Sequence, residues 1–132
     1  MQGYNAIVVF NKSADKLLMC KRSKNPHKGL VNFVGGKIEW NEDGLVAAYR
    51  ELEEETAISK ADISLSHLMD FTYYHENFYL EIYVGRLKRD VCITGDENEL
   101  LWVSTDENFF DVTKYAGDGN IGHILRQIAK QK

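Results

Sequence analysis

Segments rich in β-branched and aromatic side chains recur along the chain and predict a sheet of several strands. They are residues 4–10, 16–22, 31–34, 63–74, 78–87 and 99–104. The first two are separated by the turn-like residues 11–15, which predicts a hairpin. From Phe78 to Val84 every second side chain is aliphatic or aromatic and faces one side, as in a strand with one face on a core. Residues 23–29 hold the only proline and are expected to form a loop.

Two other segments repeat their apolar residues with the period of a helix. Residues 41–57 carry a stripe at i, i+3, i+4 and i+7, formed by Leu45, Ala48, Tyr49 and Leu52. Asn41 is the expected N-cap, followed by Glu42 and Asp43 in the first turn. A last helix is expected to start near Asn120, with the same spacing in Ile121, Ile124, Leu125 and Ile128. Strands around a central helix, closed by a terminal helix, predict an α/β protein with a mixed sheet between helices.

Length and composition narrow the class of protein. The chain has 132 residues, 44% hydrophobic and 27% charged, which predicts one soluble globular domain over residues 1–132. The net charge of −4 argues against a broad basic surface for nucleic acid. The N-terminal residues resemble neither a signal peptide nor a membrane span, so a cytoplasmic location without membrane attachment is expected. Cys20 and Cys92 have no metal-binding spacing and are expected to be buried free thiols.

The acidic end of the first helix is the strongest chemical signal. Residues 50–55 read RELEEE, and helical geometry places Glu51, Glu54 and Glu55 on one face, with Glu53 pointing elsewhere. Acidic runs are most often solvated surface. Here, however, like charges one turn apart repel by about 0.2–0.5 kcal/mol per pair, and they lie at the helix end whose dipole disfavours anions. A divalent cation that takes carboxylate oxygens would offset both effects.

The spacing of these residues resembles the box of the Nudix hydrolase family, G-x5-E-x7-R-E-U-x-E-E-x-G-U, where U is apolar. The match begins at Gly36, passes through Glu42 and Arg50, and ends at Ile58, with eight of the nine specified positions identical in kind. The departure is Ala57, where the family has glycine. A glycine there is typical of a left-handed residue after a helix, so alanine would cost about 1 kcal/mol without affecting the chemistry.

The resemblance implies a fold and a set of roles. The fold would be the Nudix α/β/α sandwich. Mg²⁺ or Mn²⁺ would be held by Glu51, Glu54 and Glu55, with the carbonyl of Gly36, and water would attack a phosphorus atom of a nucleoside diphosphate-linked substrate. Arg50 would orient a motif glutamate through a salt bridge, and Glu42 would belong to the same polar network.

The general base and the phosphate contacts are less determined by the resemblance. Some family members supply a glutamate a few residues before a strand tryptophan, which here indicates Glu99, with Glu97 as its neighbouring alternative; a helix glutamate is a third choice. Lys37 is a candidate for substrate phosphate or a solvated loop lysine. Arg22, in a basic cluster at residues 21–28, is a second phosphate candidate or part of a solvated loop.

Local features suggest which base or other group the substrate carries besides its phosphates. Asn120 occupies the place of an asparagine that reads the base in MutT-type members, which act on oxidised purine nucleotides such as 8-oxo-dGTP; a helix N-cap is the other interpretation. Tyr79 is a candidate for stacking on a base. Tyr73 or Tyr74 lies at the distance at which dinucleoside polyphosphate hydrolases carry a tyrosine. These features favour a nucleoside triphosphate pyrophosphohydrolase of MutT type.

Three alternatives remain beside that interpretation. One is a hydrolase of dinucleoside polyphosphates, ADP-ribose or nucleotide sugars. Another is a non-catalytic Nudix domain that senses a nucleotide, although such domains commonly lose box glutamates that this chain keeps. A structural protein ranks last because it gives no reason for the clustered acids. Family members are often dimers, so a homodimer is left open.

Overall fold

A computed structural model describes residues 1–24, 28–95 and 98–130. Within these residues, seven strands form one sheet. They are β1 (Gln2–Phe10), β2 (Lys16–Lys21), β3 (Val31–Asn32), β4 (Lys37–Ile38), β5 (Ser66–Tyr73), β6 (Phe78–Arg86) and β7 (Glu99–Ser104). The two helices are α1 (Gly44–Thr56) and α2 (Asn120–Lys130). The chain thus has the mixed sheet and two helices of the predicted α/β fold.

β1 lies at the centre of the sheet and changes partners along its length. Its C-terminal end pairs antiparallel with β2 at Val9 and Phe10. Its N-terminal half pairs antiparallel with β4, and Ile7 forms a bridge with Val34. On its other side β1 runs parallel to β6 over nine residues, while β5 follows β6 at the edge. β2 therefore diverges from β1. Because β3 and β7 pair with β2, they lie on the diverging part of the sheet.

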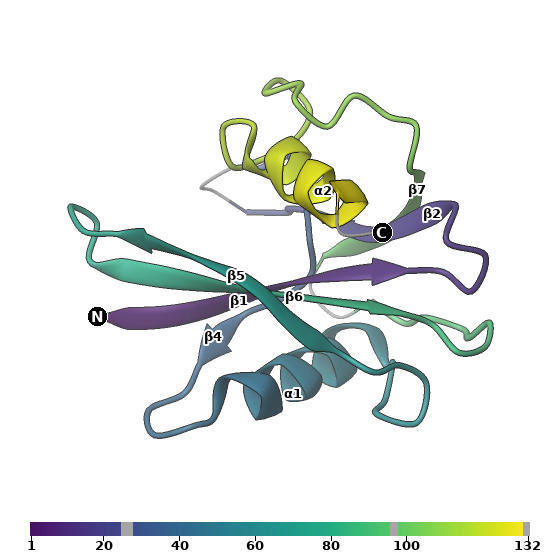
Figure 1. The fold of residues 1–132 in the computed structure, drawn as a ribbon, viewed down its shortest axis with the longest axis horizontal. Coiled ribbons are helices and arrows are strands. Elements are labelled where there is room, and N and C mark those ends of the chain that lie inside the picture. The colour runs from purple at the N-terminus through teal and green to yellow at the C-terminus, as the bar shows by residue number, and fades with distance from the viewer. Residues whose placement is uncertain (25–27, 96–97, 131–132) are drawn as a thin grey trace.

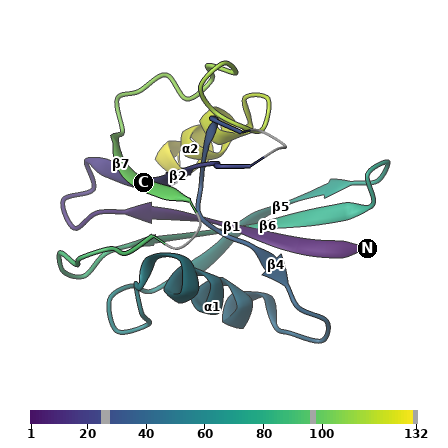
Figure 2. The same ribbon diagram turned by 180° about the vertical axis from the view of Figure 1, so that it is seen from behind.

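The helices cover opposite faces of this sheet, with α2 above it and α1 below it in Figure 1, and Figure 2 shows the same layers from behind. Each face has its own buried core. Alternate residues of β1 divide between the two: Val8 packs under α2, whereas Ile7 and Val9 pack with Leu52 of α1. This alternation follows from the two-residue period of a strand.

The start of α1 differs from the sequence prediction. Asp43, rather than Asn41, is the N-cap, since its carboxylate accepts hydrogen bonds from the N–H groups of Leu45 (3.1 Å) and Val46 (3.2 Å). Asn41 instead lies in the preceding loop with a left-handed φ of 61°. Leu45, expected in the buried stripe, is 40% exposed because it lies in the first turn, and Ala47 is buried instead. From the second turn onward the predicted stripe is correct, since Ala48 and Leu52 are buried and Tyr49 packs against the same core.

The end of α1 has the geometry that the family glycine would favour. Ala57 is the C-cap, with a left-handed φ of 66°, and its N–H donates to the carbonyl of Glu53 at 2.9 Å. An alanine in this conformation brings its Cβ close to backbone oxygen, which costs free energy that glycine avoids. The helix therefore ends where the box predicts, in a strained but complete cap.

Other differences are local. The expected strand at residues 31–34 is shorter, because after Asn32 the chain leaves β2 and Val34 bridges to β1. Cys20 is buried as expected, but Cys92 is exposed, so the prediction of a buried thiol there is wrong; it lies in a loop after β6. Among the described residues, neither helix is long and apolar enough to cross a bilayer.

Candidate functional site

A pocket of about 640 Å³ opens where β2 diverges from β1. Its floor includes Asn5 and Ala6 of β1, and one wall includes Cys20 of β2. The segment between Phe33 and Lys37 closes another side, because it takes the place beside β1 that β2 has left. The exchange of strand partners thus creates the pocket.

The pocket lining combines two kinds of side chain. The side chains of Arg22, Lys37 and Glu55 provide charged groups on the pocket lining. Tyr4, Phe78 and Leu80 add apolar surface to the same lining. Cations suit phosphate oxygens, and aromatic rings suit a flat base, so this lining matches the two parts of a nucleotide.

Arg50 organises the acidic residues beside the pocket. Its Nε and Nη2 atoms form a bidentate ion pair with Glu42, at 2.7 and 2.8 Å. Its Nη1 atom contacts Glu51 at 3.0 Å and Glu54 at 3.3 Å, and Nη2 also donates to the carbonyl of Lys37 at 3.0 Å. One guanidinium therefore connects the loop before α1 to the carboxylates near its end.

The electrostatics of this network follow from these contacts. The hydrogen bonds from Arg50, and then from the N–H of Glu39, lower the pKa of Glu42 to about 2. Burial acts in the opposite direction on Glu51 and raises the pKa of its carboxyl, although Arg50 partly offsets this effect. Hydrogen bonds to Glu42 raise the pKa of Arg50, so the guanidinium remains charged. Glu51 is thus a carboxylate that needs further positive charge to be fully stabilised.

Gly36 lies directly against the carboxylate of Glu51. A Cβ added to Gly36 would come within 2.3 Å of Glu51 Oε2 and 2.4 Å of its Cδ, so any other residue at this position would displace the carboxylate. The absence of a side chain lets the backbone approach this carboxylate. The first residue of the box, Gly36, and its central glutamate, Glu51, are 15 positions apart in sequence and are therefore brought together by the fold.

The donor set fits a hard divalent cation in kind, since it consists of carboxylates and a backbone carbonyl. The side chains are not gathered as a finished site, however. Among the described residues, no three His, Cys, Asp or Glu side chains are grouped to hold a metal ion as they stand. Arg50 binds Glu51 and Glu54 instead, and Glu54 is 57% exposed. Binding of a cation would require these carboxylates to exchange one positive partner for another.

The other residues singled out in the sequence are distributed unevenly. Arg22 and Lys37 line the pocket, whereas Tyr79 and Asn120 are not among its lining residues. Tyr79 projects from the opposite face of β6, where its ring covers Gly3. Phe78 lines the pocket in its place. Phe78 and Tyr79 lie on opposite faces of β6, because successive side chains of a strand alternate, and base stacking by Tyr79 stays a prediction.

Glu99 is exposed at the start of β7, opposite Lys21 of β2, and its neighbour Asn98 lines the pocket instead. Glu97 lies outside the described residues. Asn98 accepts a hydrogen bond from the backbone N–H of Ser23 at 3.1 Å, so it connects the two loops beside the pocket. The position of Glu99 leaves its role as a base a prediction.

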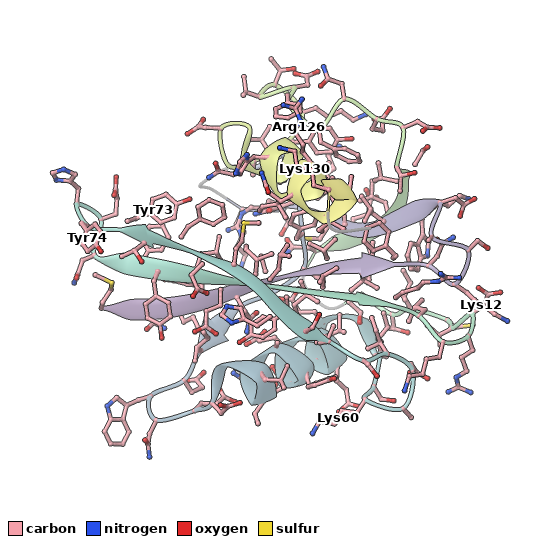
Figure 3. The ribbon with its side chains drawn as sticks, viewed as in Figure 1. Lys12, Lys60, Tyr73, Tyr74, Arg126 and Lys130 are labelled. Atoms are coloured by element: carbon pink, nitrogen blue, oxygen red, sulfur yellow. The ribbon has the colours of Figure 1, made fainter. Side chains whose placement is uncertain are left out.

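Asn120 is the first residue of α2, and its side chain is turned toward the β5–β6 hairpin. Its Nδ2 donates a hydrogen bond of 2.9 Å to the hydroxyl of Tyr73, whose ring stacks on Phe78 with centroids 4.5 Å apart. Figure 3 shows Tyr73 near the hairpin end of β5, with Tyr74 beyond it at the tip. Phe78 thus connects Asn120 indirectly to the pocket lining.

The sequence reasoning missed several lining residues. Cys20 and Phe33 appear in the sequence as ordinary core positions, and only the strand divergence exposes them to a pocket. Asn5 did carry a signal, because it is an amide within the apolar run of residues 4–10. An amide buried in a strand requires hydrogen-bond partners, which indicates a special position.

Comparison with known proteins agrees with this geometry. An RNA pyrophosphohydrolase of Pelagibacter ubique (strain HTCC1062) is 44% identical over 57 residues, which is 43% of this chain and 35% of that protein. The match thus spans about a third of that relative's length. An Ap4A hydrolase from C. elegans superposes with a TM-score of 0.78 at 19% identity, over 99% of this chain and 97% of that one. A MutT NUDIX hydrolase from Burkholderia pseudomallei gives 0.72 at 21%, over 96% and 97%.

The two structural likenesses establish the fold, and the sequence family is established separately. The model of the NUDIX domain matches residues 1–124, nearly the whole chain. That family typically depends on a divalent metal and binds nucleotide-containing substrates. The polar network around Arg50 and the glycine against Glu51 are therefore the local features of a family site, and the chain belongs to the Nudix hydrolase family.

Proposed function

We propose that this chain hydrolyses a phosphoanhydride bond in a nucleoside diphosphate-linked substrate, and that its substrate is a nucleoside triphosphate. The observation that carries the proposal is the pocket beside the motif glutamates, which combines cationic side chains with an aromatic wall. Hydrolysis would release a nucleoside monophosphate and pyrophosphate. Oxidised purine nucleotides such as 8-oxo-dGTP belong to this substrate class.

The charged residues would act on the phosphates. Arg22 and Lys37 supply positive charge to phosphate oxygens on the pocket lining. Glu51, Glu54 and Glu55, with the carbonyl of Gly36, would hold Mg²⁺ or Mn²⁺. When bound, such a cation polarises a phosphoryl oxygen and lowers the pKa of water.

A general base must take the proton of the attacking water. Glu55 is favoured over Glu99, because Glu55 lines the pocket, whereas Glu99 is exposed at the edge formed by β2 and β7. Arg50 would orient Glu51 and Glu54 through the ion pairs described above. Glu42, held ionised by Arg50, would fix the guanidinium in turn.

A panel assay tests the proposal. The purified chain with Mg²⁺ is offered nucleoside triphosphates, 8-oxo-dGTP, ADP-ribose and diadenosine polyphosphates, and the released phosphate products are separated. The proposal expects pyrophosphate and a monophosphate from a triphosphate at the highest kcat/KM. Nucleotide binding without turnover of any substrate would instead indicate a sensing domain.

A second substrate is favoured by a separate observation. The relative from Pelagibacter ubique is named an RNA pyrophosphohydrolase, and an RNA 5′ end carries the same triphosphate group as a free nucleotide. A short 5′-triphosphorylated RNA therefore joins the panel. The net charge of −4 predicts that such an RNA would be bound by its terminal nucleotide rather than along its length. A strong increase of kcat/KM with RNA length would contradict that expectation.

A further inference from the structure

Asn5 is an amide buried in the centre of the sheet, with 4% of its surface exposed. It lies on the same face of β1 as Ile7 and Val9, which pack against α1, since alternate residues of a strand share a face. An apolar side chain would pack in the core at this position, as Ile7 and Val9 do further along the same face. The amide therefore calls for a specific explanation.

Asn5 forms two hydrogen bonds with Gly36, one through its backbone and one through its side chain. The backbone N–H of Asn5 donates to the carbonyl of Gly36 at 2.8 Å. The backbone N–H of Gly36 donates to the side-chain Oδ1 of Asn5 at 3.0 Å. These two bonds fix both polar groups of the glycine whose carbonyl is a proposed cation ligand.

The second amide atom of Asn5 has no such partner. Among the described residues, its Nδ2 is the one buried side-chain nitrogen or oxygen without a hydrogen-bond partner. The amide cannot be reversed to relieve this, because Oδ1 is required by the N–H of Gly36. A buried donor without an acceptor is costly, so an acceptor is expected to meet it in another state of the site.

Glu51 is the carboxylate that lies against Gly36, the residue to which Asn5 is hydrogen-bonded. Three of its atoms lie within 2.8 Å of the place where a Cβ of Gly36 would stand, and the side chain of Glu51 is 13% exposed. One of its oxygens, Oε1, is held at 3.0 Å by Arg50. The carboxylate of Glu51 and the amide of Asn5 thus both adjoin Gly36, Glu51 beside its Cα and Asn5 through its backbone N–H.

We propose that Asn5 is a positioning residue of the cation site: it fixes Gly36 by two hydrogen bonds and donates its unpaired Nδ2–H to Glu51 when Glu51 turns from Arg50 toward a cation. This inference rests on the proposed metal site and adds to it a residue outside the motif. Partners that orient a metal ligand typically change metal affinity by about 10-fold to 100-fold when removed.

The first test measures Mn²⁺ affinity directly, by calorimetry or by the magnetic resonance signal of the free ion, in the whole chain without substrate. Asn5→Leu should weaken Mn²⁺ binding by about 10-fold to 100-fold. Asn11→Ala is the matched control, because it removes an amide that holds a turn just beyond β1, accepting from Asp15 and Lys16. The control should bind Mn²⁺ as tightly as the unmodified chain.

A double-mutant cycle then tests the link to Glu51. Because Asn5 also fixes Gly36, Asn5→Leu should still weaken Mn²⁺ binding once Glu51→Gln is present, but by a smaller factor than in the unmodified chain. Additive effects of the two substitutions would overturn the proposal, as would unchanged affinity in Asn5→Leu alone. If the unmodified chain binds no Mn²⁺, the metal site itself fails, and that result is distinguishable from a site that binds Mn²⁺ without using Asn5.

A third measurement needs no variant that might misfold. In the native chain labelled with ¹³C and ¹⁵N, one proton of the Asn5 side-chain amide should move downfield and exchange more slowly with solvent as Mg²⁺ is added. The change should occur over the same Mg²⁺ concentrations as the shift of the Glu51 carboxylate carbon. An Asn5 amide that remains unchanged at saturating Mg²⁺ would overturn the proposal.

Discussion

The Nδ2 atom of Asn120 donates a 2.9 Å hydrogen bond to the hydroxyl of Tyr73, which lies 47 residues earlier in the chain. The bond joins the start of α2 to the hairpin between β5 and β6. Burial is the main cause of the raised pKa of Tyr73, and the lone pairs of its hydroxyl oxygen accept from Asn120. Two residues that the sequence suggested separately, as marks of different substrate classes, thus share one interaction.

This pair allows a direct test of base recognition. Both Asn120→Ala and Tyr73→Phe remove the same hydrogen bond, so each should lower the free energy of unfolding by about 0.5–1.5 kcal/mol. If Asn120 also contacts the base, only Asn120→Ala should reduce the ratio of kcat/KM between 8-oxo-dGTP and dGTP. Equal ratios in the two variants would show that Asn120 acts only by supporting Tyr73.

Removal of one motif carboxylate should separate catalysis from stability. Glu54→Gln should lower Mg²⁺-dependent kcat/KM by about 10-fold or more, since it removes a proposed ligand. Glu53→Gln is the matched control, because Glu53 is its exposed neighbour and has no proposed role in the site. The assay is product release from a nucleoside triphosphate. Equal activity in both variants would refute the metal assignment.

Restoring the glycine of the family motif at position 57 should stabilise the chain. Because Ala57 has a φ of 66°, Ala57→Gly should raise the free energy of unfolding by about 1 kcal/mol. Ala47→Gly, in the interior of α1, should lower it by about as much or more. Urea unfolding measures both. A loss of stability in Ala57→Gly would mean that the left-handed cap is not where the strain lies.

The lowered pKa of Glu42 should make the free energy of unfolding depend on pH. Its folded-state pKa is lowered from 4.5 to about 2, so the stability that it contributes is present above pH 4.5 and is lost as pH falls toward 2. Glu42→Gln should therefore be less stable than the unmodified chain at neutral pH, and the difference should shrink as pH approaches 2. Unfolding free energies across this range provide the measurement.

Glu51 should change the pH dependence of the free energy of unfolding in the opposite direction from Glu42. Burial raises its folded-state pKa, so the folded chain binds this proton more tightly than the unfolded chain, and that stability is lost as pH rises through the raised value. Glu51→Gln should thus gain stability relative to the unmodified chain as pH rises. A difference that stays constant with pH would contradict the raised pKa.

The two thiols should react at very different rates. Cys92 is exposed, whereas Cys20 is buried, and burial raises the pKa of Cys20 to about 11. Since the thiolate is the reactive form, iodoacetamide should label Cys92 first. Mass spectrometry of digested protein locates the label. Comparable labelling of Cys20 in the folded chain would indicate that the pocket admits reagents that deprotonate or reach this thiol.

The sequence predicted the elements better than their ends. Periodicity identified both helices, because burial of one face is a property of the whole segment. It placed the start of α1 two to three residues early, because Asn41 and Asp43 are both good N-cap residues and only the loop conformation decides between them. The motif spacing indicated the acidic cluster, since the spacing encodes one face of a helix.

The pocket could not be predicted in the same way. Tyr79 and Phe78 are adjacent aromatic residues of one strand, and which of them lines the pocket depends on the sheet face that the rest of the molecule covers. Asn5 is distant in sequence from every motif residue, and it reaches Gly36 only because β4 pairs with β1. Such long-range pairing is not encoded in local patterns.

The change of strand partners along β1 also divides the sheet into two parts. The half of β1 that pairs with the segment after Val34 is tied to the acidic helix, whereas the half-sheet carrying β2 and β7 is attached to it through only a short stretch near Val9. Cys20 and Arg22 line the pocket from the side of β2, whereas Asn5 and Gly36 line it from the side of β1. Substitutions on the β2 side therefore alter the shape of the opening without changing the hydrogen bonds that hold Gly36 against β1.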